Sequence, residues 1–150
     1  MFAMEYDVHK LERNEVAALA QLIALFREVF ELGASQPVPE AHLSTLLART
    51  DFIALVATQG ETVIGGLTAH VLPQYHSTKP IVYLYDLAVG TEFQRQGIGG
   101  ALLSALNTHA KEIGADEVFV QADVEDVHAL EFYRRTGGRP ASVMHFTYPL

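Results

Sequence analysis

Hydrophobic residues recur along the chain with two different periods, which mark the first predicted elements. Polar and apolar positions alternate over residues 2–8, predicting a short β-strand with one buried face. Apolar residues then recur every three or four positions over 16–30, the spacing of an amphipathic helix. Asn14 suits the N-cap of this helix and Gly33 suits its end.

The rest of the chain also divides into periodic segments separated by turn residues. The further predicted elements are a helix from Pro39 to about Arg49, strands over 51–58, 62–72 and 81–89, a helix over 97–114, a strand over 117–122, a helix over 127–136 and a last strand over 142–148. The turn at 59–61 predicts an antiparallel hairpin between the first two of these strands. With 150 residues, no linker and no internal repeat, we expect a single domain over 1–150.

Composition limits the possible partners. Hydrophobic residues make up 49% of the chain, enough for a buried core, and the net charge is −8. This charge disfavours DNA or RNA as a partner and favours a cationic substrate. The absence of cysteine excludes disulfides, a thiol nucleophile and thiolate metal ligands. No apolar run approaches the ~18 residues of a membrane span and the first residues lack a basic signal-peptide region, so we expect a cytoplasmic protein without membrane association.

Seven histidines raise the question of a metal site. None of them shows the spacing H-x-x-x-H or H-E-x-x-H, so we expect no metal. His145, in the last predicted strand, is interpreted as a core histidine.

A glycine-rich segment follows the predicted strand 81–89 and opens the next helix. It has the pattern Q-x-x-G-x-G, with Arg95 inside it, and differs from both the Walker loop and the dinucleotide-binding fingerprint. The unpaired N–H groups and the dipole of a helix N-terminus favour an anion, and Arg95 adds a positive charge. The alternative is a glycine-rich turn that merely begins an ordinary helix.

This motif resembles the acetyl-coenzyme A signature of the GNAT N-acetyltransferases, and the element order resembles that fold throughout. Residues 132–138 resemble the family segment F-Y-x-x-x-G-F, with Gly138 in place of the last Phe. The resemblance implies an α/β fold with a mostly antiparallel sheet, a splayed parallel pair and flanking helices. It places Leu87, Ala88 and Val89 on a bulged strand that pairs with pantetheine. It assigns pyrophosphate binding to Gln94, Arg95, Gln96, Gly97, Ile98, Gly99 and Gly100.

A narrower resemblance is to the gentamicin-type aminoglycoside 3-N-acetyltransferases. It is carried, in order, by 52–55, 71–73, 85–89, 95–98, 120–123 and 143–146. It implies acetyl transfer from acetyl-CoA to the 3-amino group of the deoxystreptamine ring, and thus antibiotic resistance. The chain departs from the pattern at Gly99-Gly100, where an Ala-containing pair is usual, and in the acceptor loops around 75–79 and 125–127.

Asp86 is a carboxylate within an otherwise apolar strand, 81–89. An unpaired carboxylate in such a strand costs several kcal/mol, so it requires a partner or a chemical role. It is either hydrogen-bonded to a neighbouring loop, or it is a general base or anchor for the attacking ammonium group. The resemblance to the aminoglycoside enzymes favours the second interpretation.

Tyr133 is the proton donor to the leaving thiolate, as the family resemblance implies. The alternative is a packing tyrosine on the amphipathic helix that carries Leu130.

Acidic residues gather where the predicted strand 117–122 leads into the next helix. Asp123, Glu125 and Asp126 predict an acidic rim that binds the ammonium groups of an aminoglycoside, with Asp123 the first choice. The alternative for Asp126 is a helix N-terminus, where the dipole favours acids. Glu28 and Glu31 are further candidates, although surface charges are the more common role for such residues.

Two other functions stay open. One is a GNAT enzyme that acetylates a polyamine or a protein amine, and the other is a non-catalytic CoA-binding regulatory module. By analogy with the fold, we also expect a homodimer formed through an edge strand or through 142–148.

Overall fold

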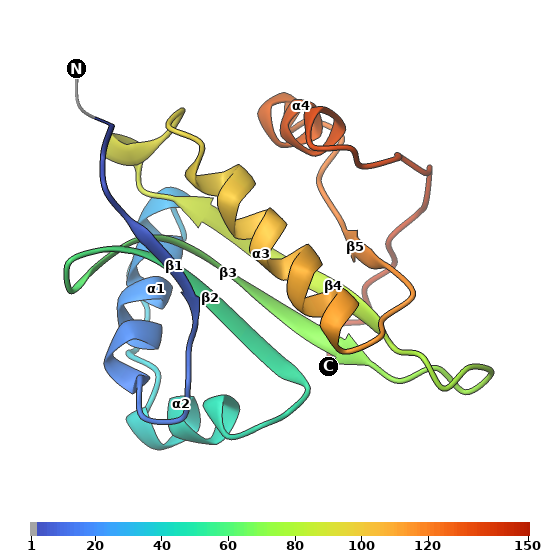
Figure 1. Cartoon of the computed structure of the whole chain (residues 1–150), viewed down its shortest axis with the longest axis horizontal. Coiled ribbons are helices and arrows are strands. Elements are labelled where there is room, and N and C mark those ends of the chain that lie inside the picture. Colours follow the sequence, from blue (N-terminus) through green and yellow to red (C-terminus); the bar gives the residue numbers. More distant parts are fainter. Residues whose placement is uncertain (1–2) are drawn as a thin grey trace. The chain divides into compact units, whose positions relative to one another are not determined.

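The computed structural model describes residues 3–150, which form two compact units, the chain up to Val120 and Gln121–Leu150 (Figure 1). The elements in order are β1 (Asp7–Lys10), α1 (Val16–Val29), α2 (Glu40–Leu47), β2 (Phe52–Gln59), β3 (Thr62–Leu72), β4 (Ile81–Val89), the 3-10 turn η1 (Thr91–Phe93), α3 (Ile98–Glu112), β5 (Val118–Val120) and α4 (Val127–Arg135). The single domain over 1–150 stays a prediction. Among the described residues, no helix is both long and apolar enough to cross a membrane.

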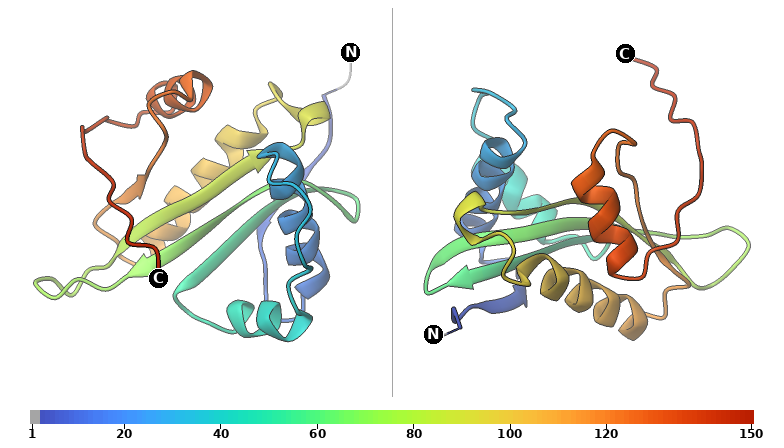
Figure 2. Two further views of the ribbon diagram at one scale, coloured as in Figure 1. Left: turned by 180° about the vertical axis from the view of Figure 1, so that it is seen from behind. Right: turned by 90° about the horizontal axis from the view of Figure 1, so that it is seen from above.

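The first unit is a five-stranded sheet in the order β1-β2-β3-β4-β5. All neighbouring strands are antiparallel except β4 and β5, which are parallel, so the predicted mixed sheet is confirmed. α1 and α2 pack on one face and α3 on the other, as the edge-on view of Figure 2 shows. β2 is buried from Phe52 to Ala57 because alternate side chains enter these two layers.

α1 approaches β3 closely at Gly66. A Cβ atom at this position would lie 2.5 Å from Leu22 Cδ1 and 2.7 Å from the Leu55 carbonyl oxygen. Gly66 pairs with Ala88, and Thr68, two residues further along β3, pairs with Asp86. The tight contact therefore holds α1 over the sheet beside the Asp86 position.

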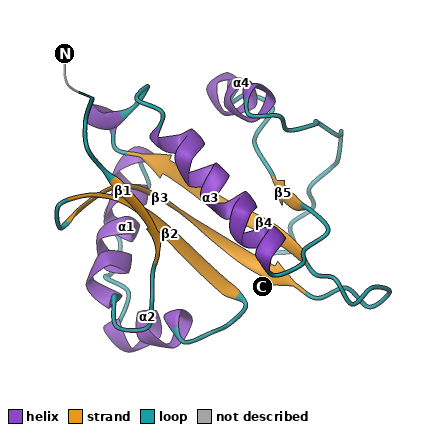
Figure 3. Cartoon of the chain, viewed as in Figure 1, coloured by secondary structure: helices purple, strands orange, loops and turns teal. Residues whose placement is uncertain are grey.

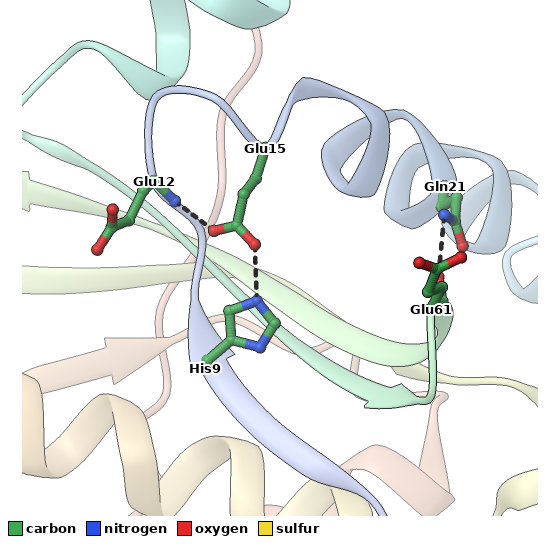
Figure 4. A network of polar contacts seen from close by, with 5 residues as sticks. All are labelled: His9, Glu12, Glu15, Gln21 and Glu61. Atoms are coloured by element: carbon green, nitrogen blue, oxygen red, sulfur yellow. Dashed lines mark hydrogen bonds and ion pairs between the residues drawn. The ribbon is translucent and has the colours of Figure 1, made fainter.

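Side-chain hydrogen bonds of Glu15, just before α1, and of Gln21, within α1, hold this helix in place (Figure 4). The Glu15 carboxylate accepts hydrogen bonds from the Glu12 amide at 2.8 Å and from His9 Nε2 at 3.0 Å. Burial raises the pKa of Glu15, but these two hydrogen bonds, together with the electrostatic interaction with His9, outweigh it and the net shift is downward. Gln21 accepts a hydrogen bond from the Val63 amide at 3.0 Å and donates one to the Glu61 carbonyl at 3.4 Å, which fixes α1 to the β2–β3 turn.

The ends of α1 differ from the prediction. The helix begins after Glu15 instead of Asn14. At its other end Glu31, with φ of 54°, is the first residue of positive φ after the helix, and Gly33, with φ of 71°, follows two residues later. The Glu31 amide donates to the Glu28 carbonyl and the Leu32 amide to the Arg27 carbonyl, the hydrogen bonds of a Schellman motif.

The second unit is organised around α4. Asp126 is its N-cap, since its Oδ1 accepts a hydrogen bond of 3.0 Å from the Ala129 amide. Gly137, with φ of 100°, ends the helix. At Gly138 a Cβ would lie 2.8 Å from the Tyr133 carbonyl oxygen, so the residue that replaces the family's Phe lets the chain pass directly against this helix turn.

Four sequence-based expectations need correction. The strand predicted over 142–148 is wrong, because this segment is loop in Figure 3 and its unit contains no strand with which it could pair. Its large apolar side chains are 71–85% exposed, and His145 is exposed rather than part of a core. The strand predicted over 117–122 is limited to β5. The first strand starts at Asp7, and the start of the predicted alternation, Phe2, lies outside the described residues.

Candidate active site

β4 carries a bulge at Tyr85. Leu84 pairs with Ala69 and Asp86 pairs with Thr68, so Tyr85 is an extra residue without a counterpart on β3. A bulge redirects the side chains around it. The resemblance implies a bulged segment at 87–89, whereas the structure has the register shift at Tyr85, two residues before this segment.

The bulge brings the side chains of Tyr85 and Asp86 to the sheet face on which α1 and α2 pack. Thr68, opposite Asp86, also pairs with Ala54, which belongs to the core cluster under α1 and α2. The Tyr85 ring lies 5.7 Å from His70, the partner of Phe52 in the same cluster. Two consecutive residues thus share a face that regular strand geometry would separate.

β4 and β5 diverge at the bulge. Their pairing covers only Val82–Leu84 of β4. Within the described chain, residues 85–89 have β3 along one edge and no strand along the other. A free strand edge offers backbone N–H and C=O groups to an extended ligand. Leu87, Ala88 and Val89 lie on this edge, which fits the pantetheine arm of coenzyme A.

Asp86 is partly buried, and burial raises the pKa of its carboxyl group. No hydrogen bond or ion pair to this carboxylate occurs in the part of the chain that the structure describes. Burial also raises the pKa of Tyr83, and the nearby Tyr85 and Asp86 raise it further. The hydrogen bond to a loop, one of the two interpretations of Asp86, is thus not found among these residues. The carboxylate is well suited to accept a proton.

The loop after β4 adopts the backbone that an anion site requires. Arg95 and Gly97 both have positive φ, 62° and 84°. Gly97 precedes the first turn of α3, whose Ile98, Gly99 and Gly100 amides have no acceptor within the helix. These amides and the Arg95 guanidinium suit a pyrophosphate. Gln94 has a different contact, because its side-chain amide donates a hydrogen bond of 3.0 Å to the Val89 carbonyl.

The acids predicted around α4 belong to the second unit together with Tyr133. Asp123 and Glu125 are exposed, whereas Asp126 caps the helix, the alternative role considered for it. Tyr133 is partly buried, and its ring meets that of Phe132 at 5.1 Å in an edge-on contact. Glu28 and Glu31 are exposed at the end of α1 in the first unit.

Residues 19–138 match the acetyltransferase (GNAT) family. The chain is a GNAT acetyltransferase. The match runs from residue 19, within α1, to residue 138, just after α4, and includes the β4 bulge and the loop before α3.

Relatives of this GNAT chain include proteins described as aminoglycoside enzymes. Its structure resembles that of an aminoglycoside acetyltransferase, meta-AAC0020, from an uncultured soil metagenomic sample, solved in complex with sisomicin, with 44% identity, a TM-score of 0.94 and coverage of 97% and 96% of the two chains. A second soil enzyme, HMB0005, is 36% identical, with a TM-score of 0.88 and coverage of 98% and 99%. An aminoglycoside N(6')-acetyltransferase type 1 of Stenotrophomonas maltophilia is 28% identical over an alignment of 155 positions, which covers 100% of this chain and 97% of that protein.

The GNAT chain also contains an aromatic row that sequence reasoning missed. Rings from four strands follow one another on the face of Asp86, in the order Phe52, His70, Tyr85, Tyr83, Phe119. Their neighbouring centroids lie 4.6–5.7 Å apart. The only sequence signal is the pair of tyrosines two residues apart in β4, because strand register alone brings the other rings beside them.

Proposed function

We propose that this protein transfers the acetyl group of acetyl-CoA to an aminoglycoside, at the 3-amino group of the deoxystreptamine ring of gentamicin-type antibiotics. The main support is the 44% identity, over 97% of the chain, with an aminoglycoside acetyltransferase solved with sisomicin. The net charge of −8 suits a polycationic acceptor. Because acetyl-CoA is a cytoplasmic metabolite, the cytoplasm is the compartment we expect.

Asp86 is the general base of the proposed reaction. An aminoglycoside amine is protonated near neutral pH and becomes a nucleophile only after it loses a proton. A carboxylate within about 3 Å, or one water away, accepts this proton. The desolvation that raises the pKa of Asp86 brings its basicity closer to that of the task. The amine nitrogen then bonds to the acetyl carbon as the carbon–sulfur bond breaks, without an acyl-enzyme.

The backbone of the first unit holds the co-substrate, whose thioester supplies the activated acetyl group. Leu87, Ala88 and Val89 align the pantetheine arm along the free edge of β4, and their amides polarise the acetyl carbonyl. The segment 94–100 binds the pyrophosphate through the first amides of α3 and through Arg95. Gln94 contributes by holding this loop against Val89.

The remaining roles are those of a proton donor and of acids that attract the acceptor. Tyr133 donates a proton to the leaving thiolate, although a phenol of pKa about 10 needs a favourable environment for this. Asp123 and Glu125 attract ammonium groups of the drug, with smaller contributions from Asp126, Glu28 and Glu31. The exposed apolar segment 142–148 forms the interface of a homodimer in this proposal. In sedimentation, Phe146→Asp should have a lower molecular mass than wild type, and an unchanged mass would contradict this interface.

The position of the new amide tests the proposed function. Sisomicin is incubated with the protein and acetyl-CoA, and two-dimensional NMR of the product locates the acetyl group. Acetylation at N3 supports the proposal, whereas a 6'-amide would assign the chain to the type of its Stenotrophomonas relative. Turnover of spermidine or a basic peptide alone would replace the substrate class. Coenzyme A binding without turnover of any amine would indicate a regulatory module.

A further inference from the structure

Tyr85 has the most exposed ring of the aromatic row, with 56% of the residue accessible to solvent. Tyr83 and Phe119 stack face to face, at 4.6 Å and 3° between their planes, so each ring covers a face of the other. Phe52 is buried at 8% exposure. The ring most accessible to a ligand is therefore that of Tyr85.

The orientation of Tyr85 is defined by its two neighbours. Its ring meets His70 at 5.7 Å and 81°, and Tyr83 at 5.5 Å and 70°, both edge-on contacts. Edge-on contact is a favoured arrangement of aromatic pairs, and two such contacts restrict the rotation of the exposed Tyr85 ring. An ordered exposed ring binds a ligand with a smaller entropic penalty than a freely rotating one.

Tyr85 is also fixed in position relative to the proposed base. The bulge places Tyr85 and Asp86 on one face of the sheet, as the pairing of Leu84 with Ala69 and of Asp86 with Thr68 shows. An acceptor whose amine reaches Asp86 from this face therefore has the Tyr85 ring beside it. Sugar C–H groups and ammonium groups both bind to aromatic faces, the latter by cation–π attraction.

We propose that Tyr85 is a specificity-determining acceptor residue, whose ring packs against a sugar or ammonium group of the polycation while Asp86 holds the reacting amine. This rests on the proposed function, because it names a contact within the same acceptor site. His70 and Tyr83 act as positioning residues for the ring. The hydroxyl group of Tyr85 has no role in this contact.

The test compares Tyr85→Leu with Tyr85→Phe in steady-state kinetics with sisomicin and acetyl-CoA. Loss of the ring is expected to raise KM for sisomicin about 3- to 30-fold, the range of a cation–π contact, with KM for acetyl-CoA within about twofold of wild type. Tyr85→Phe is expected to behave like wild type. Tyr85→Val provides a second ring-less variant, and Tyr6→Leu, before the opposite edge strand β1, is the matched control.

Results that overturn the role of Tyr85 can be distinguished from a result that overturns the proposed function. A wild type that acetylates sisomicin while Tyr85→Leu and Tyr85→Val keep the same KM overturns the role of Tyr85 and leaves the proposed function intact. The role of the ring is also overturned if Tyr85→Phe loses as much as Tyr85→Leu, because the hydroxyl group would then carry the effect. A wild type that acetylates no aminoglycoside overturns the proposed function itself.

Discussion

The side-chain amide of Gln94 donates a hydrogen bond of 3.0 Å to the carbonyl of Val89, the last residue of β4. This contact links the strand edge proposed for pantetheine to the loop proposed for pyrophosphate. Gln94, the first residue of the Q-x-x-G-x-G motif, thereby orders the binding loop through the protein's own backbone.

Replacing Gln94 tests this role. Gln94→Ala removes one exposed hydrogen bond, about 1 kcal/mol at most, so KM for acetyl-CoA should rise about 3- to 5-fold. KM for sisomicin should stay within about twofold of wild type. Gln59→Ala, an exposed glutamine at the end of β2, is the control. An unchanged KM for acetyl-CoA in Gln94→Ala would show that the loop is ordered without this bond.

Gly97, which precedes α3, and Gly100, in the first turn of α3, should respond differently to replacement by alanine. Gly97 has φ of 84°, so Gly97→Ala should cost about 1–2 kcal/mol of folding stability and raise KM for acetyl-CoA. A Cβ at Gly100 meets nothing within 4 Å, and alanine in a helix is favoured over glycine by up to about 1 kcal/mol. Gly100→Ala should therefore raise the melting temperature and keep KM, as measured by thermal denaturation and kinetics. Equal losses in both variants would contradict this account.

The raised pKa of Asp86 predicts the pH dependence of the reaction. A base acts only when deprotonated, so kcat/KM should fall as pH decreases through the raised pKa, above the ordinary Asp value of about 3.9. Asp86→Asn should lower kcat/KM strongly and remove this acidic limb. A variant with wild-type kcat/KM would exclude Asp86 as the base.

The raised pKa of Asp86 also predicts that Asp86→Asn, although less active than wild type, is more stable at pH 7. Because burial raises the pKa of Asp86 in the folded state, the folded protein binds this proton more tightly than the unfolded chain does. Ionisation therefore lowers stability as pH rises from the unfolded value through the raised folded value. Asp86→Asn should melt at a higher temperature than wild type at pH 7, with a smaller difference near pH 4. A variant less stable than wild type at pH 7 would indicate a stabilising partner for the carboxylate.

Glu31 offers a test that separates stability from acceptor binding. A glutamate with φ of 54° is strained, and glycine relieves this strain. Glu31→Gly should stabilise the protein by about 1 kcal/mol, as measured by denaturant unfolding. If its carboxylate attracts the drug, KM for sisomicin should also rise, by up to about threefold. Glu28→Gln, at the end of the same helix, controls for charge without relieving strain.

The two long inner strands β3 and β4 were the most predictable elements. The expected bounds 62–72 and 81–89 agree with β3 and β4 to the residue, because apolar or β-branched runs there are limited by turn residues on both sides. The glycine-rich loop before α3 was also recognisable, since positive φ and helix initiation depend on local sequence.

Features that depend on distant partners were not predictable. Alternation over 142–148 has the pattern of a strand, but a strand also needs a neighbouring backbone, and its own unit has none. The family resemblance implied a bulged strand at 87–89, but the position of the bulge at Tyr85 is set by the register between β3 and β4, which a single strand does not reveal. Phe52, His70 and Phe119 become neighbours of the tyrosines by the same register.

The ratio of kcat/KM for sisomicin to that for spermidine, measured by release of coenzyme A thiol from acetyl-CoA, tests the central claim most directly. Both acceptors are polycations, so general attraction to the acidic protein favours neither strongly. The account predicts rapid turnover of sisomicin and a ratio far above one. Turnover of spermidine with none of sisomicin would contradict the proposed substrate while leaving the GNAT fold and its acetyl donor in place.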